Sequence, residues 1–323
     1  MTLSMKNPEK SEAFLNLDMM SVEEIEIQQR RIAFYSVEAL KAAIVIDKIH
    51  LTHPDFKRSL NAMDRIFQLA PEMDMAQGML LSGPTGVGKT AVFKYFRDSL
   101  PASNLFAPGY GALGLRCPLR PTVGFFIGTL LRAYKYPFSN GTERQLYARR
   151  SIVFDAIREK KTRLMFIDEA GGFLNVKTQT SIQFGETDVS DFIREMIDEC
   201  GMGVVLATSS SVDSLDGLDS SLASRITVRQ TLREFKPDIE WLGVLSAFAK
   251  QCSSYDLSFI QTPVIANELH NATNGNLRVL KRLMIESVLI GVDSGKMALD
   301  QEVLARAFDL IFGNSAGRTN VFK

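Results

Sequence analysis

Gly83-Pro-Thr-Gly-Val-Gly-Lys-Thr90 is the stretch of sequence that decides the fold. It matches the pattern GxxxxGK[ST] at every fixed position. An apolar run at 79–82 precedes it, and a helical pattern at 90–99 follows it. A strand, a glycine-rich loop and a helix in this order are typical of a phosphate-binding loop. The sequence therefore predicts a nucleotide-binding site here, with a chance glycine-rich turn as the alternative.

Each part of this loop has an expected task. The glycines let backbone N–H groups turn towards phosphate oxygens. Lys89 is expected to reach the β and γ phosphates of ATP, and the Thr90 hydroxyl is expected to hold Mg²⁺. The predicted cofactors are thus ATP and Mg²⁺, and the residues expected to bind the nucleotide are Gly83, Pro84, Thr85, Gly86, Val87, Gly88, Lys89 and Thr90.

An acidic pair follows a second apolar run. Asp168 and Glu169 come directly after 164–167, a continuous apolar segment typical of a parallel strand buried on both faces. At the carboxyl end of such a strand we expect Asp168 near Mg²⁺, and Glu169 where it can polarise a water for attack on the γ-phosphate. The loop and this pair together predict a Mg²⁺-dependent ATPase. The alternative is a solvated strand end without a role.

Two further strands complete the predicted sheet. One, at 203–207, ends in the hydroxyls of Thr208 and Ser209, and the other is predicted at 226–228. If the first lies between the strands at 79–82 and 164–167, its hydroxyls can sense the γ-phosphate; strand-end capping is the alternative. Strands that alternate with helices indicate a parallel, layered α/β sheet.

The predicted helices divide the chain into four parts. Before and between the strands we expect helices from residue 21 towards 46, within 49–71, at 122–134 and at 142–160, while 101–121 is irregular with at most a short strand. After Pro237 the pattern is helical only, at 238–251, 261–273, 276–291 and 299–311. We therefore predict a helical extension with a mobile start (1–48), an α/β nucleotide-binding domain (49–234), an all-helical lid (235–312) and a flexible tail (313–323).

The composition sets limits on class and location. Of the 323 residues 46% are hydrophobic and 23% are charged, as in soluble globular proteins. The three cysteines lie outside any CxxC spacing, and the N-terminus lacks a signal peptide pattern. No apolar stretch approaches the roughly 18 residues that cross a bilayer. We expect a cytoplasmic protein with no membrane partner.

Charge is balanced over the whole chain but not along it. Basic and acidic residues number 37 each, so any contact with a polyanion needs a local patch. Between residues 115 and 163 there are eleven basic residues against three acidic ones, which is a candidate footprint for a polyanion. The alternative is that these are solvated helix faces, neutralised by the acidic stretch at 186–199.

Two arginines lie just outside the predicted pocket. They are Arg225, in Leu-Ala-Ser-Arg-Ile, and Arg278, in Asn-Gly-Asn-Leu-Arg. A guanidinium group from a neighbour or a lid can stabilise the charge that develops on a phosphate. Surface salt bridging is the alternative for each.

In this order, the elements resemble an AAA+ ATPase: a phosphate loop, an acidic strand end, a polar strand end, an SRI arginine and a helical lid with GNLR. Within that superfamily the chain looks like the TniB and TnsC regulators of DNA transposition, relatives of MuB. The resemblance covers about residues 21 to 312. It is carried by the entry at 52–70, by PTVGFFIGTLLRAYKYPF, and by LREFKPD with GNLRVLKRLM.

The resemblance implies an ATP-dependent homo-oligomer around double-stranded DNA, as a ring or a helical filament of roughly six or seven subunits per turn. Such a protein recruits transposase subunits to a target chosen by a TniQ-type selector. By position Glu169 would be the catalytic base, Thr208 sensor 1, Arg225 a trans-acting finger and Arg278 sensor 2. The implied DNA contacts lie around the helix before the acidic strand, where we expect Arg120, Lys135, Thr142 and Arg144.

One departure and two alternatives accompany this resemblance. The family commonly has a polar residue after the acidic pair, whereas Ala170-Gly-Gly-Phe follows here. A replication initiator or helicase loader shares the core, but initiators usually append a helix-turn-helix domain, for which little length follows Phe312. A nucleotide switch that binds without hydrolysis is the other alternative, and Glu169 argues against it.

Overall fold

The computed structural model describes residues 35–73, 76–137, 145–174, 189–209, 220–313 and 319–323. The chain groups into two compact units. The α/β unit comprises Ile49–Phe248 and Gln261–Lys281. The helical unit comprises the described residues up to Lys48 with Ala249–Ile260 and Arg282–Lys323. The four-part division inferred from the sequence stays a prediction, and its helix start near residue 21 lies outside the described residues.

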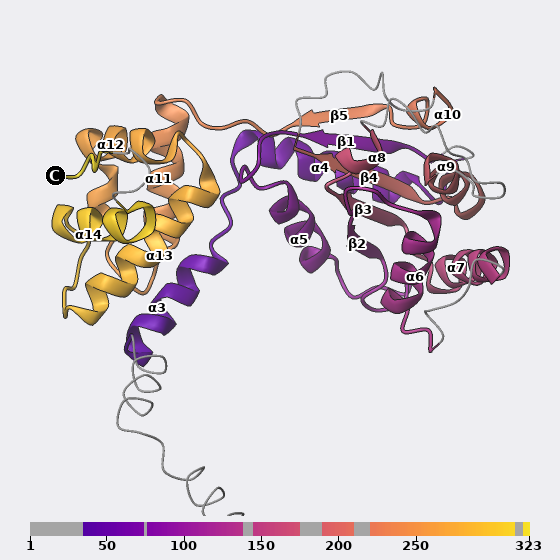
Figure 1. Ribbon diagram of the computed structural model, residues 1–323, viewed down its shortest axis with the longest axis horizontal. Coiled ribbons are helices and arrows are strands. Elements are labelled where there is room, and N and C mark those ends of the chain that lie inside the picture. The colour runs from indigo at the N-terminus through magenta and orange to yellow at the C-terminus, as the bar shows by residue number, and fades with distance from the viewer. Residues whose placement is uncertain (1–34, 74–75, 138–144, 175–188, 210–219, 314–318) are drawn as a thin grey trace, which may run out of the picture. The chain divides into compact units, whose positions relative to one another are not determined.

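A parallel five-stranded sheet forms the centre of the α/β unit (Figure 1). Its strands stand in the order β2-β3-β4-β1-β5. All neighbouring strands are parallel, which confirms the predicted α/β class, and β4 lies between β3 and β1 as the sensing role of its hydroxyls requires. The strands are β1 (Gly78–Ser82), β2 (Ala112–Arg116), β3 (Leu164–Asp168), β4 (Gly203–Thr208) and β5 (Val228–Thr231).

The fifth strand begins two residues later than the predicted 226–228. The later start has a local cause. The N–H of Ile226 donates to the carbonyls of Leu222 and Ala223, so this residue belongs to the turn after α10 (Ser220–Ala223). This N–H is used there and cannot join a strand ladder. The side chain of Ile226 is nonetheless buried, at 1% exposure, in the core under the sheet.

Alternate residues of the strands face opposite sides of the sheet, as the two-residue period of a strand dictates. In β3, Met165 and Ile167 belong to one hydrophobic cluster, whereas Leu164 and Phe166 belong to another. Both faces are therefore covered. This explains why the apolar runs are continuous instead of alternating with polar residues.

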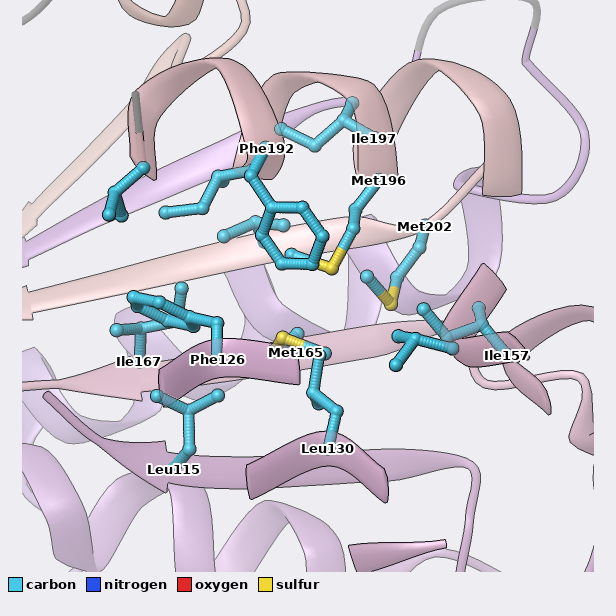
Figure 2. Packing of buried hydrophobic residues seen from close by; sticks show 14 of the residues in the cluster. Leu115, Phe126, Leu130, Ile157, Met165, Ile167, Phe192, Met196, Ile197 and Met202 are labelled. Carbon is cyan, nitrogen blue, oxygen red and sulfur yellow. The ribbon is translucent and has the colours of Figure 1, made fainter. Parts of the chain in front are cut away.

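Three helices cover the first face: α6 (Val123–Ala133), α7 (Leu146–Lys160) and α9 (Val189–Cys200). Figure 2 shows Phe126 and Leu130 of α6, Ile157 of α7, and Phe192 and Met196 of α9 gathered over β3. Each side chain is at most 1% exposed, and such burial contributes about 1.5–3 kcal/mol per side chain. The predicted start of α7 at 142 lies outside the described residues.

The other face is covered by α4 (Pro54–Leu69) and α5 (Lys89–Ser99). Phe93 of α5 stacks on Phe166 of β3 with a ring-centroid distance of 4.5 Å. Gly114 of β2 makes room for it, since a Cβ at this position would lie 2.4 Å from Phe93 Cε1. This packing fixes α5 against β2 and β3, and with it the residues at the start of that helix.

Apart from an isolated bridge between Asp256 and Ala298, the remaining elements of the described residues are helical. α11 (Ile239–Gln251) and α12 (Pro263–Thr273) meet where Trp241 Nε1 donates to the carbonyl of Ala266 at 2.7 Å. In the helical unit α3 (Val37–Lys48) packs Ala39 and Ala43 on Leu289 of α13 (Leu277–Asp293). The remaining elements are α8 (Gly171–Leu174), η2 (Ser258–Gln261) and α14 (Gln301–Phe312). Among the described residues no helix combines the length and apolarity needed to cross a membrane.

Candidate nucleotide-binding site

The phosphate loop, residues 83–90, runs from the end of β1 into the first turn of α5, so it lies between a strand and a helix as predicted. Gly83, Gly86 and Gly88 have φ angles of 147°, 93° and 106°, a backbone region that other residues rarely adopt. A Cβ at Gly83 would also lie 2.2 Å from the carbonyl oxygen of Leu232. The glycines are therefore needed for the loop to curl between β1 and α5.

Lys89 is held inside the curl of this loop. Its side chain is 8% exposed, and Nζ donates to the carbonyls of Gly83 at 2.6 Å and Pro84 at 2.7 Å. Burial lowers the pKa of Lys89, while the nearby charge of Asp168 opposes that shift. The loop thus presents a cation, already largely removed from water, where a polyphosphate would bind.

Thr90 and Asp168 meet at the end of the sheet. Thr90 Oγ1 donates to Asp168 Oδ2 at 2.5 Å, and Asp168 Oδ1 accepts the N–H of Glu169 at 3.0 Å. Hydroxyl and carboxylate oxygens are ligands that Mg²⁺ prefers, and Mg²⁺ usually takes its other ligands from water and phosphates. Within the described ranges no group of three or more His, Cys, Asp or Glu side chains could hold a metal ion. The hydroxyl oxygen of Thr90 and the carboxylate oxygens of Asp168 fit a Mg²⁺ ion whose other ligands are phosphate oxygens and waters.

Glu169 is engaged by an arginine that the sequence did not single out. Arg116 ends β2 and lies opposite Asp168 in the strand register. It donates from Nε to Glu169 Oε2 at 2.9 Å and from Nη2 to Oε1 at 2.7 Å. The hydrogen bond from Arg116 is the largest cause that lowers the pKa of Glu169. Glu169 is therefore a carboxylate whose two oxygens are both in use.

The backbone around Glu169 is also constrained. Its φ of 56° is unusual for a residue with a side chain. The N–H of Ala170 donates to the carbonyl of Ala207 in β4 at 2.8 Å, and a Cβ at Gly172 would lie 2.4 Å from the carbonyl oxygen of Pro118. Because residue 172 is glycine, the loop that follows β2 can lie close to the segment after the acidic pair.

A pocket of about 400 Å³ opens beside Glu169. It is lined by Arg116, Cys117, Pro118, Leu119, Phe125, Glu169 and Gly172.

Thr208 and Arg278 are the two residues for which the sequence predicts a sensor role. Thr208 is the last residue of β4, is 1% exposed and stands beside Ser82 of β1. Arg278 is exposed and makes no ion pair with any residue that the structure describes, but its charge helps to lower the pKa values of Lys89 and Glu169. Its guanidinium is therefore within electrostatic reach of the phosphate loop. The sensor roles of both residues stay predictions.

Arg225 is bound within its own subunit. Its Nε and Nη2 donate to the two oxygens of Asp198 at 2.6 and 2.7 Å, and Nη1 donates to the carbonyl of Ser221 at 2.6 Å. The side chain is only 19% exposed. In this conformation Arg225 joins α9 to α10, and a trans-acting role would require the ion pair with Asp198 to open.

The basic region is partly neutralised, as its alternative interpretation anticipated. Arg150 pairs with Glu195 and Glu199, and Arg158 pairs with Asp155 and Glu199, so that α7 and α9 are joined by opposite charges. Fewer basic side chains between residues 115 and 163 are therefore available to contact a polyanion than the count along the chain suggests.

Two of the four residues expected to contact DNA can be placed. Arg120 and Lys135 are exposed at opposite ends of α6, which at 11 residues is about 16 Å long. Thr142 and Arg144 lie outside the described residues. The structure therefore places Arg120 and Lys135 apart, beyond the two ends of this helix, and the role of all four residues in DNA binding stays a prediction.

Asn276 is a second residue of the site that the sequence did not reveal. It precedes α13, its side chain is 8% exposed, and its amide donates to the carbonyl of Thr85 at 2.8 Å. Asparagine is one of the residues preferred directly before the first turn of a helix. Its contact with the phosphate loop, 191 positions away, follows only from the fold.

The sheet is parallel, β1 leads into the phosphate loop, β3 ends in the acidic pair, and β4 with its polar end lies between them. This arrangement is typical of the AAA+ ATPase class. The sequence profile of the family described as "Bacterial TniB protein" matches residues 41–236. This is more than half of the chain, and the protein belongs to the TniB family. A comparison with curated proteins found no match.

Three solved structures share the fold at low sequence identity. The ORC2 protein of Aeropyrum pernix, in ADPNP–ADP complexes, has a TM-score of 0.62 and 14% identity over 82% of this chain and 71% of its own. The ORC1 protein of the same organism, in complex with DNA, has a TM-score of 0.59 and 17% identity over 83% and 69%. Cdc6p of Pyrobaculum aerophilum has a TM-score of 0.56 and 16% identity over 81% and 69%.

Proposed function

We propose that this protein is an ATP-dependent AAA+ regulator of DNA transposition, which oligomerises around double-stranded DNA and recruits a transposase. Membership of the TniB family over residues 41–236 is the observation that carries this proposal. The proposed partners are transposase subunits and a TniQ-type target selector, and the proposed location is the cytoplasm. The exposed Arg120 and Lys135 are the described residues proposed to contact DNA.

The geometry supports the use of ATP with Mg²⁺. Lys89 and the loop N–H groups would bind the β and γ phosphates, and Thr90 with Asp168 would hold the ion. Bound Mg²⁺ neutralises charge on the phosphate oxygens. Arg278, which stands free of ion pairs within the described part of the chain, would add positive charge near the γ-phosphate.

Glu169 is the proposed base for hydrolysis, and Arg116 restrains it. A general base needs an oxygen free to take a proton from the attacking water. Both oxygens of Glu169 accept hydrogen bonds from Arg116 in this conformation. We therefore expect slow basal hydrolysis, which rises when the pair opens.

Arg116→Ala is expected to raise basal ATP turnover by about threefold to fivefold, because the exposed ion pair that it removes is weak. Steady-state phosphate release with Mg²⁺ and without DNA measures this. Arg132→Ala is a suitable control, since Arg132 is also exposed but contacts Thr129 instead of an acidic residue. Unchanged turnover in the Arg116 variant would show that the pair does not restrain hydrolysis.

The Arg116–Glu169 pair also favours a second candidate function, a nucleotide switch that assembles partners without hydrolysis. A carboxylate permanently engaged by arginine would bind nucleotide yet leave water unactivated. The two candidates differ in turnover on DNA. Sustained phosphate release in the presence of duplex DNA supports the ATPase, and its absence in the intact protein supports the switch.

Assembly on DNA is the central test of the proposal. With non-hydrolysable ATP and duplex DNA, electron microscopy is expected to show rings or helical filaments of the protein. The Lys89→Ala variant, treated in the same way, is expected to stay unassembled because it lacks the cation of the loop. Finding only monomers of the wild-type protein would contradict the proposal.

A further inference from the structure

Asn276 joins three segments of the α/β unit. Its Nδ2 donates to the carbonyl of Thr85 at 2.8 Å and to Glu234 Oε1 at 3.0 Å. Its Oδ1 accepts the N–H groups of Arg278 at 3.1 Å and Val279 at 3.4 Å, which caps the start of α13. One buried amide therefore contacts the phosphate loop, the segment between β5 and α11, and the first turn of α13.

These contacts fix two successive peptide groups of the phosphate loop. The carbonyl of Thr85 points to Asn276 Nδ2, and the carbonyl of Gly86 accepts the N–H of Arg278 at 3.0 Å. In a trans peptide the C=O and N–H groups point in opposite directions, and the described residues contain no cis peptide bond. The N–H groups of Gly86 and Val87 are therefore turned away from α13.

The fit between Asn276 and the loop is close. A Cβ at Gly86 would lie 2.4 Å from Asn276 Oδ1 and 3.1 Å from Arg278 Cβ. The loop can approach Asn276 to this distance only because residue 86 is glycine. Phosphate oxygens are recognised by such oriented backbone N–H groups, so the orientation of each peptide plane matters for affinity.

We propose that Asn276 is a positioning residue of the nucleotide site, which holds the Thr85–Gly86 and Gly86–Val87 peptides with their N–H groups turned to the phosphates of ATP or ADP. The inference rests on the proposed binding of ATP and adds a residue to that site. Asn276 acts through the loop and does not itself touch the nucleotide. Its loss should weaken phosphate binding more than it slows the chemical step.

The first test compares Asn276→Ala with a matched control in the helical unit. Asn320 makes the same kinds of contact, because its Nδ2 donates to Ala305 and Asp309 and its Oδ1 accepts the N–H of Phe322. Titration calorimetry with Mg-ATP and with Mg-ADP is expected to show Kd raised about tenfold for Asn276→Ala. Asn320→Ala is expected to bind both nucleotides as the wild type does, even where it lowers the melting temperature.

A second variant separates the cap of α13 from the contact with the loop. Asn276→Asp keeps the acceptor for the N–H groups of α13 but cannot donate to Thr85. Combining it with Glu234→Gln removes the repulsion between two carboxylates, and the new amide can donate to the introduced carboxylate. We expect this double variant to melt close to the wild type, yet to bind ATP and ADP about tenfold more weakly, with kcat at saturating ATP within about twofold.

The outcomes distinguish this inference from the proposed function. If the wild-type protein and Asn320→Ala fail to bind ATP, the proposed function is wrong. If both bind ATP and the double variant binds with wild-type affinity, Asn276 serves only as a helix cap and the positioning role is overturned. A raised Kd in the double variant with an unchanged melting temperature supports it, because loss of a purely structural contact would lower stability.

Discussion

Lys89→Ala is expected to weaken ATP binding about a hundredfold, since a hydrogen bond to a charged group is worth about 1.5–3 kcal/mol and each 1.4 kcal/mol changes Kd about tenfold. The side chain is 8% exposed, and its Nζ lies 2.6 Å from the carbonyl of Gly83 and 2.7 Å from that of Pro84. The substitution removes both the cation that meets the phosphates and two bonds that brace the loop. Titration calorimetry with Mg-ATP measures the effect.

Lys94→Ala is the matched control for this change. Lys94 lies on the same helix, α5, but is exposed to solvent. Its removal changes the net charge by the same amount, so equal weakening by both variants would mean that overall charge governs binding. ATP binding by Lys89→Ala at wild-type affinity would place the nucleotide elsewhere on the protein.

Glu169→Gln is expected to lower ATP turnover by about a hundredfold to a thousandfold and to leave ATP binding nearly unchanged. General base catalysis typically contributes such factors, and an amide of the same size cannot accept the proton of the attacking water. The loop residues that bind phosphate are untouched, and Thr90 still contacts Asp168. Phosphate release on DNA, measured with saturating Mg-ATP, gives the rate, and calorimetry gives the affinity.

The control for this second change is Glu159→Gln. Glu159 is an exposed carboxylate of α7 that pairs with Lys160, so the substitution removes one negative charge from the same domain without reaching the site. Its turnover should equal that of the wild type. If Glu169→Gln also hydrolyses ATP at the wild-type rate, Glu169 is not the base and the nucleotide switch becomes the better description.

Much of the sheet can be predicted from the sequence, because a strand that is buried on both faces appears as a continuous apolar run. The runs at 79–81, 164–167 and 203–207 carry no polar side chain and are each followed by a polar residue, which predicts both the strands and the edge where the site lies. The strand β2 is harder, since its exposed positions include Gly114 and Arg116. The register of β2 against β3 depends on residues that are far apart in the sequence. No local sequence pattern therefore predicts the ion pair between Arg116 and Glu169.

Charges are the part of the site that the sequence predicts least well. Arg225 and Asp198 are 27 positions apart, and Arg150 and Glu195 are 45 apart, yet each pair forms where helices pack side by side. A count of charges along the chain cannot show which ones neutralise each other. The phosphate loop, by contrast, is a local backbone structure, and its sequence predicts it almost completely.

Gly172 has a consequence for how this protein can vary. A Cβ there would lie 2.4 Å from the carbonyl oxygen of Pro118 and 3.0 Å from that of Leu119, both of which are backbone atoms that cannot rotate aside. A relative with a side chain at position 172 must therefore carry a different backbone course after β2, where Arg120 stands. We therefore expect substitutions in the segment after the acidic pair to occur together with substitutions in the segment after β2 among homologues.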